Sequence, residues 1–233
     1  MNVIVTGGTK GIGRAIVDLF FDKGANIAVC ARNNDDLEAL ETQLKAKNAQ
    51  RSIITKSVDV SQSSQIIEFG AHVVDSWGAV DVLINNAGVF LPGEILQEST
   101  GALEKMIETN LYSAYHLTRV IAPAMISKEK GHIFNMCSIA SQIAYPNGGS
   151  YSISKFALLG FSKVLREELK NKGVKVTSIL PGATWSNSWK GVDLPQNRLM
   201  QASDVANIIW SAYNTLPSAV IEEIVLRPQL GDL

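Results

Sequence analysis

Short runs rich in β-branched residues alternate with helix-like segments along the chain, and this alternation constrains the fold more than any other feature. Seven runs are strand candidates, at 2–7, 26–31, 52–60, 80–88, 131–138, 174–182 and 221–228. Helical patterns separate them, at 11–23, 34–47, 62–77, 100–127, 151–172 and 203–214. We expect Asn33, Ser61 and Ser203 to cap helices. The alternation predicts parallel βαβ units, and therefore a doubly wound α/β fold whose seven-stranded sheet carries helices on both faces.

No linker or repeat divides the 233 residues, so a single domain spanning 1–233 is expected. With 46% hydrophobic and 18% charged residues, the chain has enough apolar material for a core, which argues against intrinsic disorder. The only long irregular stretch is 183–200. Such stretches are commonly lids or binding loops, so this one is expected on the substrate side of a site.

Net charge and apolar run lengths narrow the choice of partners and compartment. A formal net charge of -1 provides no broad basic field, so nucleic acid and anionic membranes are not expected partners. No apolar stretch reaches the roughly 20 residues of a membrane span. The apolar run starts at Val3, so no signal peptide is expected. Cys30 and Cys137 lie in strand-like runs, which favours buried thiols in a reducing compartment, the cytoplasm by default.

A glycine-rich segment, VTGGTKGIGRAI at 5–16, joins the first expected strand to the first expected helix. Gly7, Gly11 and Gly13 have G-x-x-x-G-x-G spacing, unlike the common G-x-G-x-x-G fingerprint, and no G-K-[ST] follows to bind a nucleoside triphosphate. Glycines here let the backbone approach a pyrophosphate, whose charge the helix N-terminus attracts. A ligand-free tight turn is the alternative. The flanking strand and helix favour dinucleotide binding by a Rossmann-type fold.

Tyr151 and Lys155 stand four positions apart in GGSYSISKF, so on a helix they share one face. A neighbouring cation favours the phenolate, and Lys155 is therefore expected to lower the phenol pKa of Tyr151 from its ordinary value of about 10. The pair alone is also compatible with an amphipathic helix whose lysine is solvated. Other motifs must decide between the two.

Six motifs occur in order: T-G-G-T-K-G-I-G at 6–13, N-N-A-G at 85–88, Asn110, Ser138, Y-S-I-S-K at 151–155 and P-G at 181–182. The set resembles the classical short-chain dehydrogenase/reductase family over residues 2 to about 182. The resemblance implies an oxidoreductase that transfers hydride between a nicotinamide and a carbonyl or alcohol carbon.

The resemblance also implies four catalytic residues. Tyr151 would give a proton to the carbonyl oxygen, and Ser138 would donate a hydrogen bond to it. Lys155 would hold the nicotinamide ribose hydroxyls, while Asn110 would position a water in a proton relay. Taken singly, Ser138 could satisfy a turn at the strand end and Asn110 could cap local backbone.

Cofactor-binding residues implied by the resemblance and the glycine spacing are Gly7, Thr9, Lys10, Gly11, Ile12, Gly13, Arg32, Asn33, Asp59, Val60, Asn85, Ala87, Gly88, Tyr151, Lys155, Pro181, Gly182, Thr184 and Ser186. Asn85 and Gly88 would lie beside the adenine-side ribose. Asp59 would accept from the adenine amino group, although capping of the helix near Ser61 is an almost equal alternative. Members of the family often carry Thr where this chain has Ser186.

The end of the second strand candidate bears on the choice of dinucleotide. Sites that prefer NAD place an acid there, and this chain has Ala31 followed by Arg32. Asp35 and Asp36 directly precede a helical repeat, so they are interpreted as acids of a first helical turn. Arg32, with Lys10 and Asn33, is expected to bind a 2′-phosphate. The sequence therefore predicts NADP(H) in preference to NAD(H).

Within the family, the nearest groups are 3-oxoacyl-thioester reductases and general carbonyl or sepiapterin-like reductases, so a small carbonyl or alcohol substrate is expected. Tyr145, Trp185 and Trp189 are substrate-side candidates, with loop anchoring an equal alternative for both tryptophans. An acyl carrier protein is an unsupported partner, because acids interleave the bases at the helix ends. A catalytically silent dinucleotide-binding redox sensor is the alternative class, and such a protein need not keep a proton relay.

Two further expectations concern assembly and metals. The helices at 100–127 and 151–172 carry more apolar residues than one buried stripe needs, which predicts a homodimer or homotetramer. These residues are Leu111, Leu117, Val120, Phe156, Leu159 and Phe161. The histidines and cysteines show no metal-ligand spacing, so no metal is expected.

Overall fold

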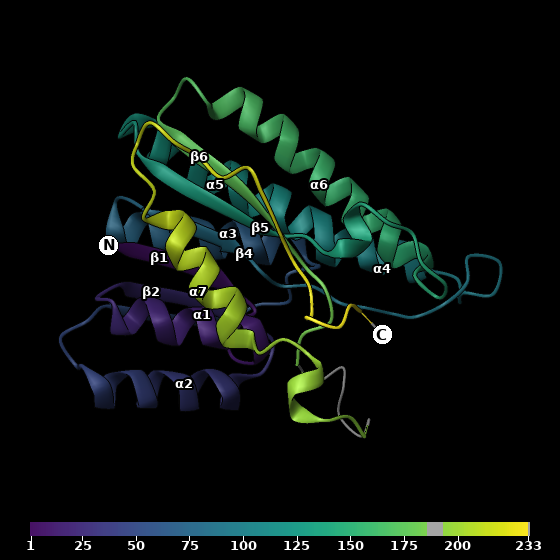
Figure 1. Cartoon of the computed structure of the whole chain (residues 1–233). Helices are drawn as coiled ribbons and strands as arrows, with labels where there is room; N and C mark the ends of the chain where they lie inside the picture. The colour runs from purple at the N-terminus through teal and green to yellow at the C-terminus, as the bar shows by residue number, and fades with distance from the viewer. Residues whose placement is uncertain (186–192, 233) are drawn as a thin grey trace.

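A computed structural model describes residues 1–185 and 193–232 (Figure 1). Its 7 strands form one parallel sheet in the order β3-β2-β1-β4-β5-β6-β7. The strands are β1 Asn2–Thr6, β2 Asn26–Ala31, β3 Ile53–Ser57, β4 Val82–Asn85, β5 Gly131–Met136, β6 Val174–Pro181 and β7 Glu223–Leu226. The predicted doubly wound Rossmann-type fold is thus confirmed.

Helices cover both faces of the sheet (Figure 1). They are α1 Gly11–Asp22, α2 Asn34–Lys47, α3 Ser63–Trp77, α4 Ala102–Ile107, α5 Ser113–Ser127, α6 Gly149–Leu169 and α7 Ala202–Tyr213. Helices α1, α2 and α7 pack on one face, and α3, α5 and α6 pack on the other.

Strand β1 shows why the strands are apolar along their whole length. Val3 and Val5 join the core under α1, α2 and α7, whereas Ile4 joins the core on the opposite face. All three are 0% exposed. A parallel sheet buried on both sides requires apolar residues at every position rather than at alternate ones.

The ends of several elements differ from the sequence prediction. Asn33 caps α2 as expected, with its side chain accepting from the Asp36 main-chain N–H. The expected caps Ser61 and Ser203 are wrong, since Gln62 precedes α3 and Gln201 precedes α7. The Ser61 hydroxyl instead donates to a carboxylate oxygen of Asp59 at 2.8 Å. Ser203 already lies inside the first turn of α7.

The helix predicted at 100–127 is interrupted. Helices α4 and α5 are joined by the π-helical turn η1 Glu108–Tyr112, which contains Asn110. A π turn inserts an extra residue into a helix and is often found at functional sites. Hydrophobic periodicity does not reveal one extra residue, so the sequence indicated a single helix.

The two ends of segment 183–200 lie side by side. Thr184 pairs with Met200, and the Trp185 N–H donates to the Met200 carbonyl at 2.9 Å. The segment therefore leaves β6 and returns to the same place before α7 begins. In the described ranges, no helix has the length and apolar character needed to cross a membrane.

Candidate active site

The carboxyl ends of β1, β4, β5 and β6 meet at one edge of the sheet. The strand order reverses between β1 and β4, which is where doubly wound sheets bind ligands. The Thr6 hydroxyl ties two of these ends together by accepting from the main-chain N–H of Asn86 at 3.0 Å and of Ala87 at 2.9 Å. The glycine-rich loop and the N-N-A-G segment therefore lie side by side at the carboxyl ends of the strands.

Lys155 is a buried cation on the inner side of α6, and it is only 5% exposed. Its Nζ donates to the Met136 carbonyl at the end of β5, at 2.7 Å. Burial lowers the pKa of the Lys155 ammonium to about 8. The group is still mostly charged at neutral pH, and it has hydrogens left to donate to a ligand.

Tyr151 lies one turn before Lys155, with its ring centre 5.8 Å from the Lys155 Nζ. Burial raises the pKa of the Tyr151 phenol, while a side-chain interaction with Ser138 acts in the opposite direction. The expectation that Lys155 sets the direction of this pKa is wrong in the protein alone, because burial dominates. Tyr151 therefore keeps its proton at neutral pH, as a proton donor must.

Ser138 follows β5 and begins the short helix η2 Ile139–Ser141. Its Oγ accepts from the Ala140 main-chain N–H at 3.1 Å. The hydroxyl thus satisfies a turn at the strand end, and the same side chain interacts with the Tyr151 phenol. Both interpretations of Ser138 from the sequence are compatible with this geometry.

Asn110 is 1% exposed and clamps the segment after β4. Its Oδ1 accepts from the Val89 N–H at 2.7 Å, and its Nδ2 donates to the Val89 carbonyl at 3.0 Å. Nδ2 also donates to the Ser154 hydroxyl at 2.9 Å. A Cβ built on Gly88 would lie 3.2 Å from the Asn110 Oδ1 and 3.5 Å from the Lys155 Nζ. Asn110 and Lys155 therefore flank the same residue.

The glycine-rich turn has the shape and polarity that a pyrophosphate needs. Gly7 has a φ of 65°, which other residues rarely adopt. A Cβ on Gly13 would lie 2.3 Å from the Gly7 carbonyl oxygen, so only glycine lets α1 start this close to the loop. The first turn of α1 contains no acid, and no described side chain caps it. Its free N–H groups suit an anion, and the residues present fit a dinucleotide.

The residues expected at a 2′-phosphate cluster after β2. Arg32 is exposed, and within the described ranges no acid forms an ion pair with it. Lys10 instead forms an ion pair with Asp36, with Nζ and Oδ2 2.5 Å apart. Asn33 is occupied as the cap of α2. A phosphate at this point would have to compete with Asp36 for Lys10.

Asn85, Asp59 and Val60 follow or end strands, and the structure places each of them in a different environment. Asn85 is 4% exposed and donates to the Asn135 Oδ1 at 2.8 Å. Its side chain therefore lies in a buried network between β4 and β5, which corrects its expected place beside a ribose. Asp59 accepts from Ser61, in keeping with the local interpretation. Val60 is 8% exposed and packs in the core under α3.

The P-G turn after β6 is held by the end of the described chain. The Gly182 N–H donates to the Leu226 carbonyl at 2.7 Å, and the Ala183 N–H donates to the Asp232 carboxylate at 2.9 Å. Tyr145 lies nearby: its pKa is raised to about 12 by burial and by the neighbouring Tyr151 and Asp232.

Of the other residues in this part of the chain, Thr184 is buried and Trp185 is partly buried. Ser186 and Trp189 lie outside the described residues.

Three residues of this region were missed by sequence reasoning, namely Phe90, Glu98 and Asp232. The Phe90 ring meets the Tyr151 ring edge-on, with centroids 4.9 Å apart. Glu98 accepts from Ser150, next to Tyr151. These contacts join segments far apart in the sequence, and no local motif encodes them.

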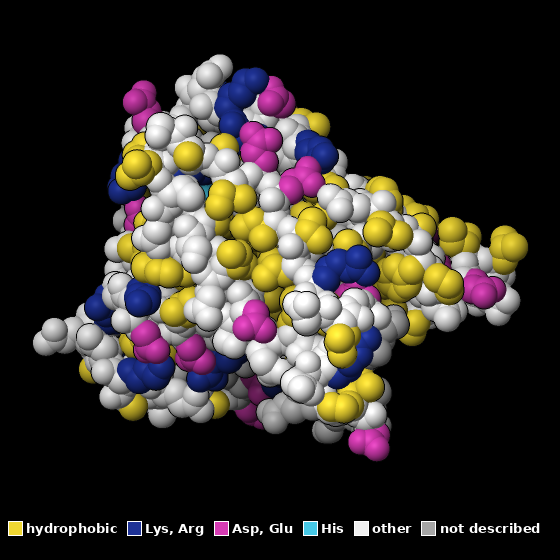
Figure 2. Space-filling model, viewed as in Figure 1, with side chains coloured by type: hydrophobic (Ala, Val, Ile, Leu, Met, Phe, Trp, Pro, Cys, Tyr) yellow, Lys and Arg dark blue, Asp and Glu magenta, His cyan; other side chains and the backbone are white. Residues whose placement is uncertain are grey.

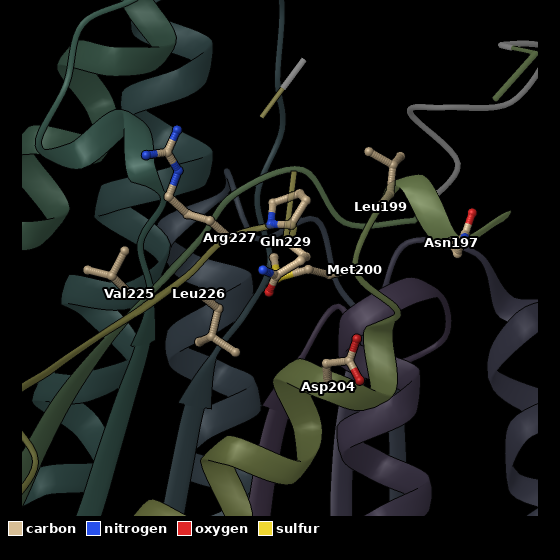
Figure 3. Close-up of a pocket in the computed structure, with 9 residues that line it drawn as sticks. Asn197, Leu199, Met200, Asp204, Val225, Leu226, Arg227 and Gln229 are labelled. Carbon is tan, nitrogen blue, oxygen red and sulfur yellow. The ribbon is translucent and has the colours of Figure 1, made fainter. Parts of the chain in front are cut away.

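A pocket of about 500 Å³ lies between the end of β7 and the start of α7 (Figure 3). Leu226, Met200 and Asp204 border it, and Arg227 extends away from Asp204. It contains none of the catalytic candidates. This pocket is therefore separate from the residues that the sequence motifs indicate at the strand ends.

The buried His132 is not suited to exchange a proton at neutral pH. Burial lowers the pKa of His132 to about 3, and its Nε2 lies 2.8 Å from the Thr177 hydroxyl. Among the residues that the structure describes, no group of three or more His, Cys, Asp or Glu could hold a metal ion.

Comparison with known proteins agrees with this geometry. The short chain dehydrogenase family profile matches residues 1–196. A sepiapterin reductase from Chlorobaculum tepidum is 31% identical, with 99% of this chain and 97% of the relative covered.

Two solved structures share the fold closely. A metagenomic short-chain oxidoreductase in complex with NADP has a TM-score of 0.85 at 30% identity, covering 98% of this chain and 97% of the other. L-Sorbose reductase from Gluconobacter frateurii, complexed with NADPH and L-sorbose, has a TM-score of 0.89 at 25% identity, covering 97% and 95%. With the fold, the glycine-rich turn and the Tyr151 and Lys155 pair in agreement, the chain belongs to the short-chain dehydrogenase/reductase family of oxidoreductases.

Proposed function

We propose that this protein is an NADPH-dependent carbonyl reductase acting on a small ketone or aldehyde. The observation that carries the proposal is the meeting of Ser138, Tyr151 and Lys155 at the strand ends, on the same edge of the sheet as the glycine-rich turn. A bound reduced nicotinamide would supply the hydride. The other contributions come from side chains of this chain.

In this proposal, Tyr151 gives its proton to the carbonyl oxygen as negative charge develops there. Its raised pKa keeps the phenol protonated until that moment. Ser138 donates its hydroxyl hydrogen to the same oxygen. Lys155 places a positive charge near Tyr151 and donates to ribose hydroxyls, while Asn110 keeps the segment after β4 against the site.

Binding of the cofactor is assigned to four segments. Gly7, Gly11 and Gly13 and the start of α1 would hold the pyrophosphate, joined by Thr9 and Ile12 of the same loop. Arg32 and Lys10 would bind the 2′-phosphate, Ala87 and Gly88 would border the adenine-side ribose, and Pro181, Gly182 and Thr184 would face the nicotinamide. Two of the relatives are described in complex with NADP or NADPH, which supports this choice of cofactor.

A small free carbonyl compound is favoured over a carrier-bound thioester. An acyl carrier protein is acidic, so its docking site must present unpaired bases. Three bases of α6 and its C-terminal end are paired with acids: Lys163 with Glu223 at 2.8 Å, Arg166 with Glu222 at 3.1 Å, and Lys170 with Glu167. The named relatives reduce sepiapterin and L-sorbose according to their names, and neither is a carrier-bound substrate.

A homo-oligomer is part of the proposal, on revised grounds. Leu117 and Leu159 are 0% and 7% exposed, so they belong to the core and do not indicate an interface. The exposed apolar residues of α5 and α6 include Tyr115 at 37%, Ile153 at 42%, Phe156 at 45% and Val164 at 58%. Figure 2 shows hydrophobic side chains gathered over α4, the start of α6 and the segment projecting beyond them.

Both thiols, Cys30 and Cys137, are unpaired and buried, which supports a reducing compartment such as the cytoplasm.

The test is a screen of NADPH oxidation over ketones, aldehydes and 3-oxoacyl thioesters, followed by NADPH absorbance. We expect turnover with small ketones or aldehydes that is lost in Tyr151→Phe. Turnover that the Tyr151→Phe variant retains would reject the assigned site. NADPH binding without any turnover would instead favour a dinucleotide sensor.

A further inference from the structure

Glu98 lies between β4 and α4, yet its carboxylate contacts the beginning of α6. Its Oε1 accepts from the Ser150 main-chain N–H at 2.8 Å, and its Oε2 accepts from the Ser150 hydroxyl. Ser150 is 3% exposed and directly precedes Tyr151. The contact therefore ends one residue from the proposed proton donor.

Two glycines leave room for this carboxylate. A Cβ on Gly149 would lie 2.2 Å from the Glu98 Oε1 and 2.6 Å from the Gly93 carbonyl oxygen. A Cβ on Gly93 would lie 2.6 Å from the Glu98 Cγ. The Gly93 N–H also donates to the Asn147 carbonyl at 3.0 Å, just before α6. Backbone from two segments thus encloses the carboxylate.

Helix α6 has no cap of its own. The residue at its N-cap position is Gly148, which offers no side chain, and its first turn contains no acid. The first N–H groups of a helix need acceptors, and a negative charge there is stabilised by the helix dipole. Glu98 supplies both from a distant part of the chain.

The segment that carries Glu98 also contacts the other proposed catalytic groups. Val89 is bonded twice to Asn110, and the Phe90 ring packs against Tyr151. The Asn110 Nδ2 further contacts Ser154, whose hydroxyl donates to the Tyr151 carbonyl at 2.7 Å. Residues 89–98 therefore contact both Tyr151 and its neighbours on α6, and Glu98 holds the end of that segment.

We propose that Glu98 is a positioning residue that holds the first turn of α6, and with it the Tyr151 phenol, at the geometry required for proton donation. This rests on the proposed carbonyl reduction, in which Tyr151 is the donor. Glu98 touches neither substrate nor cofactor in this role, so its effect must pass through Ser150 to Tyr151.

The kinetic test compares Glu98→Ala, Glu98→Gln and the control Glu94→Ala. Glu94 lies in the same segment, and among the residues that the structure describes its carboxylate accepts from Gln97 alone, at 3.0 Å. Misplacement of a reacting group by about 1 Å costs on the order of 100-fold, so we expect Glu98→Ala to lower kcat by about 10- to 100-fold. The KM for the carbonyl compound and the affinity for NADPH should change little.

Glu98→Gln keeps an acceptor oxygen on a side chain of the same length. Its kcat should therefore be much closer to that of the unmodified protein than the kcat of Glu98→Ala. Glu94→Ala should match the unmodified protein. A lowered melting temperature with unchanged kcat in Glu98→Ala would overturn the proposal and make Glu98 a helix cap only. If Glu98→Ala does not fold, Ser150→Ala removes one of the two contacts and should lower kcat in the same direction, and an unchanged kcat there rejects the role.

A second readout needs no substrate. Tyrosines are isotope-labelled at Cζ, and the Tyr151 NMR signal is identified by its loss in Tyr151→Phe. Glu98→Ala should shift this signal, whereas Glu94→Ala should leave it in place. A shifted signal in a protein that reduces no tested carbonyl compound rejects the proposed function but keeps the positioning role. An unshifted signal in Glu98→Ala rejects the positioning role in either case.

Discussion

The Lys155 ammonium nitrogen lies 5.8 Å from the centre of the Tyr151 ring, and it is anchored by the Met136 carbonyl rather than by the phenol oxygen. Lys155 therefore acts on Tyr151 through space or through a shared ligand. Burial affects the two groups in opposite directions, lowering the pKa of the ammonium and raising that of the phenol. Both shifts favour the less charged form, as expected where water is scarce.

Replacing Tyr151 by Phe should lower turnover by about 100-fold or more, since general acid catalysis typically contributes about 100- to 10,000-fold. NADPH binding should remain nearly intact, because the change removes a proton donor and little cofactor contact. Steady-state kinetics with fluorescence titration of NADPH measures both. Tyr213→Phe on α7 is the matched control and should retain full activity. Activity of Tyr151→Phe within about threefold of the unmodified protein would exclude Tyr151 as the acid.

The pH dependence of kcat/KM for reduction should follow Lys155. Its pKa in the folded protein is about 8, so the ammonium is lost as pH rises through that value. We expect kcat/KM to be flat at neutral pH and to fall above about pH 8 as the Lys155 ammonium is lost. The phenol does not cause this fall, because its raised pKa keeps it protonated there. Initial rates across this range provide the measurement. A rate that rises from pH 8 to 9 would contradict this assignment of the cation.

Lys155→Met should change how stability depends on pH. The folded pKa of about 8 is below the ordinary 10.5, so the unfolded chain binds more protons between these values and stability rises with pH across that window. At about 1.36 kcal/mol per pKa unit, the difference amounts to at most about 3 kcal/mol. Urea unfolding of both proteins from pH 7 to 10 isolates this contribution. Parallel curves for the two proteins would show that burial of Lys155 costs nothing.

The sequence predicted the sheet, its helices and the catalytic candidates because each leaves a local pattern. Strand and helix alternate in hydrophobicity, and Tyr151 and Lys155 stand at helical spacing. The pairing of Lys10 with Asp36, at 2.5 Å, was not predicted, because it joins a loop to the start of another helix. The contact of Glu98 with Ser150 spans 52 positions, and its local traces are the glycines at 93 and 149.

Asn85 was misplaced for a related reason. Its position at the end of β4 suggested a side chain in the crevice, but successive side chains of a strand alternate between faces. Asn85 points into the buried network with Asn135, and Asn86 turns back to donate to the Thr6 carbonyl at 2.8 Å. A motif fixes the residues, whereas strand register decides which way each one points.

Self-association should depend on the exposed apolar face of α6. Phe156 and Val164 are 45% and 58% exposed, and charging both as Phe156→Glu and Val164→Glu should dissociate an oligomer into chains of 25.2 kDa. Sedimentation at micromolar concentration compares the variant with the unmodified protein. Ile67→Glu, at a residue of α3 that is 41% exposed, is the control and should leave the assembly intact. An unmodified protein that sediments only as 25.2 kDa would refute self-association.

The choice between NADPH and NADH should depend on the charges after β2. Arg32 offers a cation and Ala31 leaves out the acid that an NAD site requires, so kcat/KM should favour NADPH. Each charge-assisted contact contributes roughly 1.5 to 3 kcal/mol, which corresponds to about tenfold to a hundredfold. Ala31→Asp combined with Arg32→Ile should reverse the order. Equal use of both cofactors by the unmodified protein would show that Arg32 does not bind the phosphate.

A variant at Asp36 provides a second test of the preference for NADPH. It is paired with Lys10 at 2.5 Å, and it places a negative charge where a 2′-phosphate would approach. Asp36→Asn frees Lys10 and removes that repulsion, so it should raise the preference for NADPH above that of the unmodified protein. The Asn33 cap of α2 accepts from the Asp36 main chain and survives the change. Because NADH lacks the phosphate, its kcat/KM should stay nearly constant in Asp36→Asn, and a parallel rise for both cofactors would mean that Lys10 contacts a group common to them.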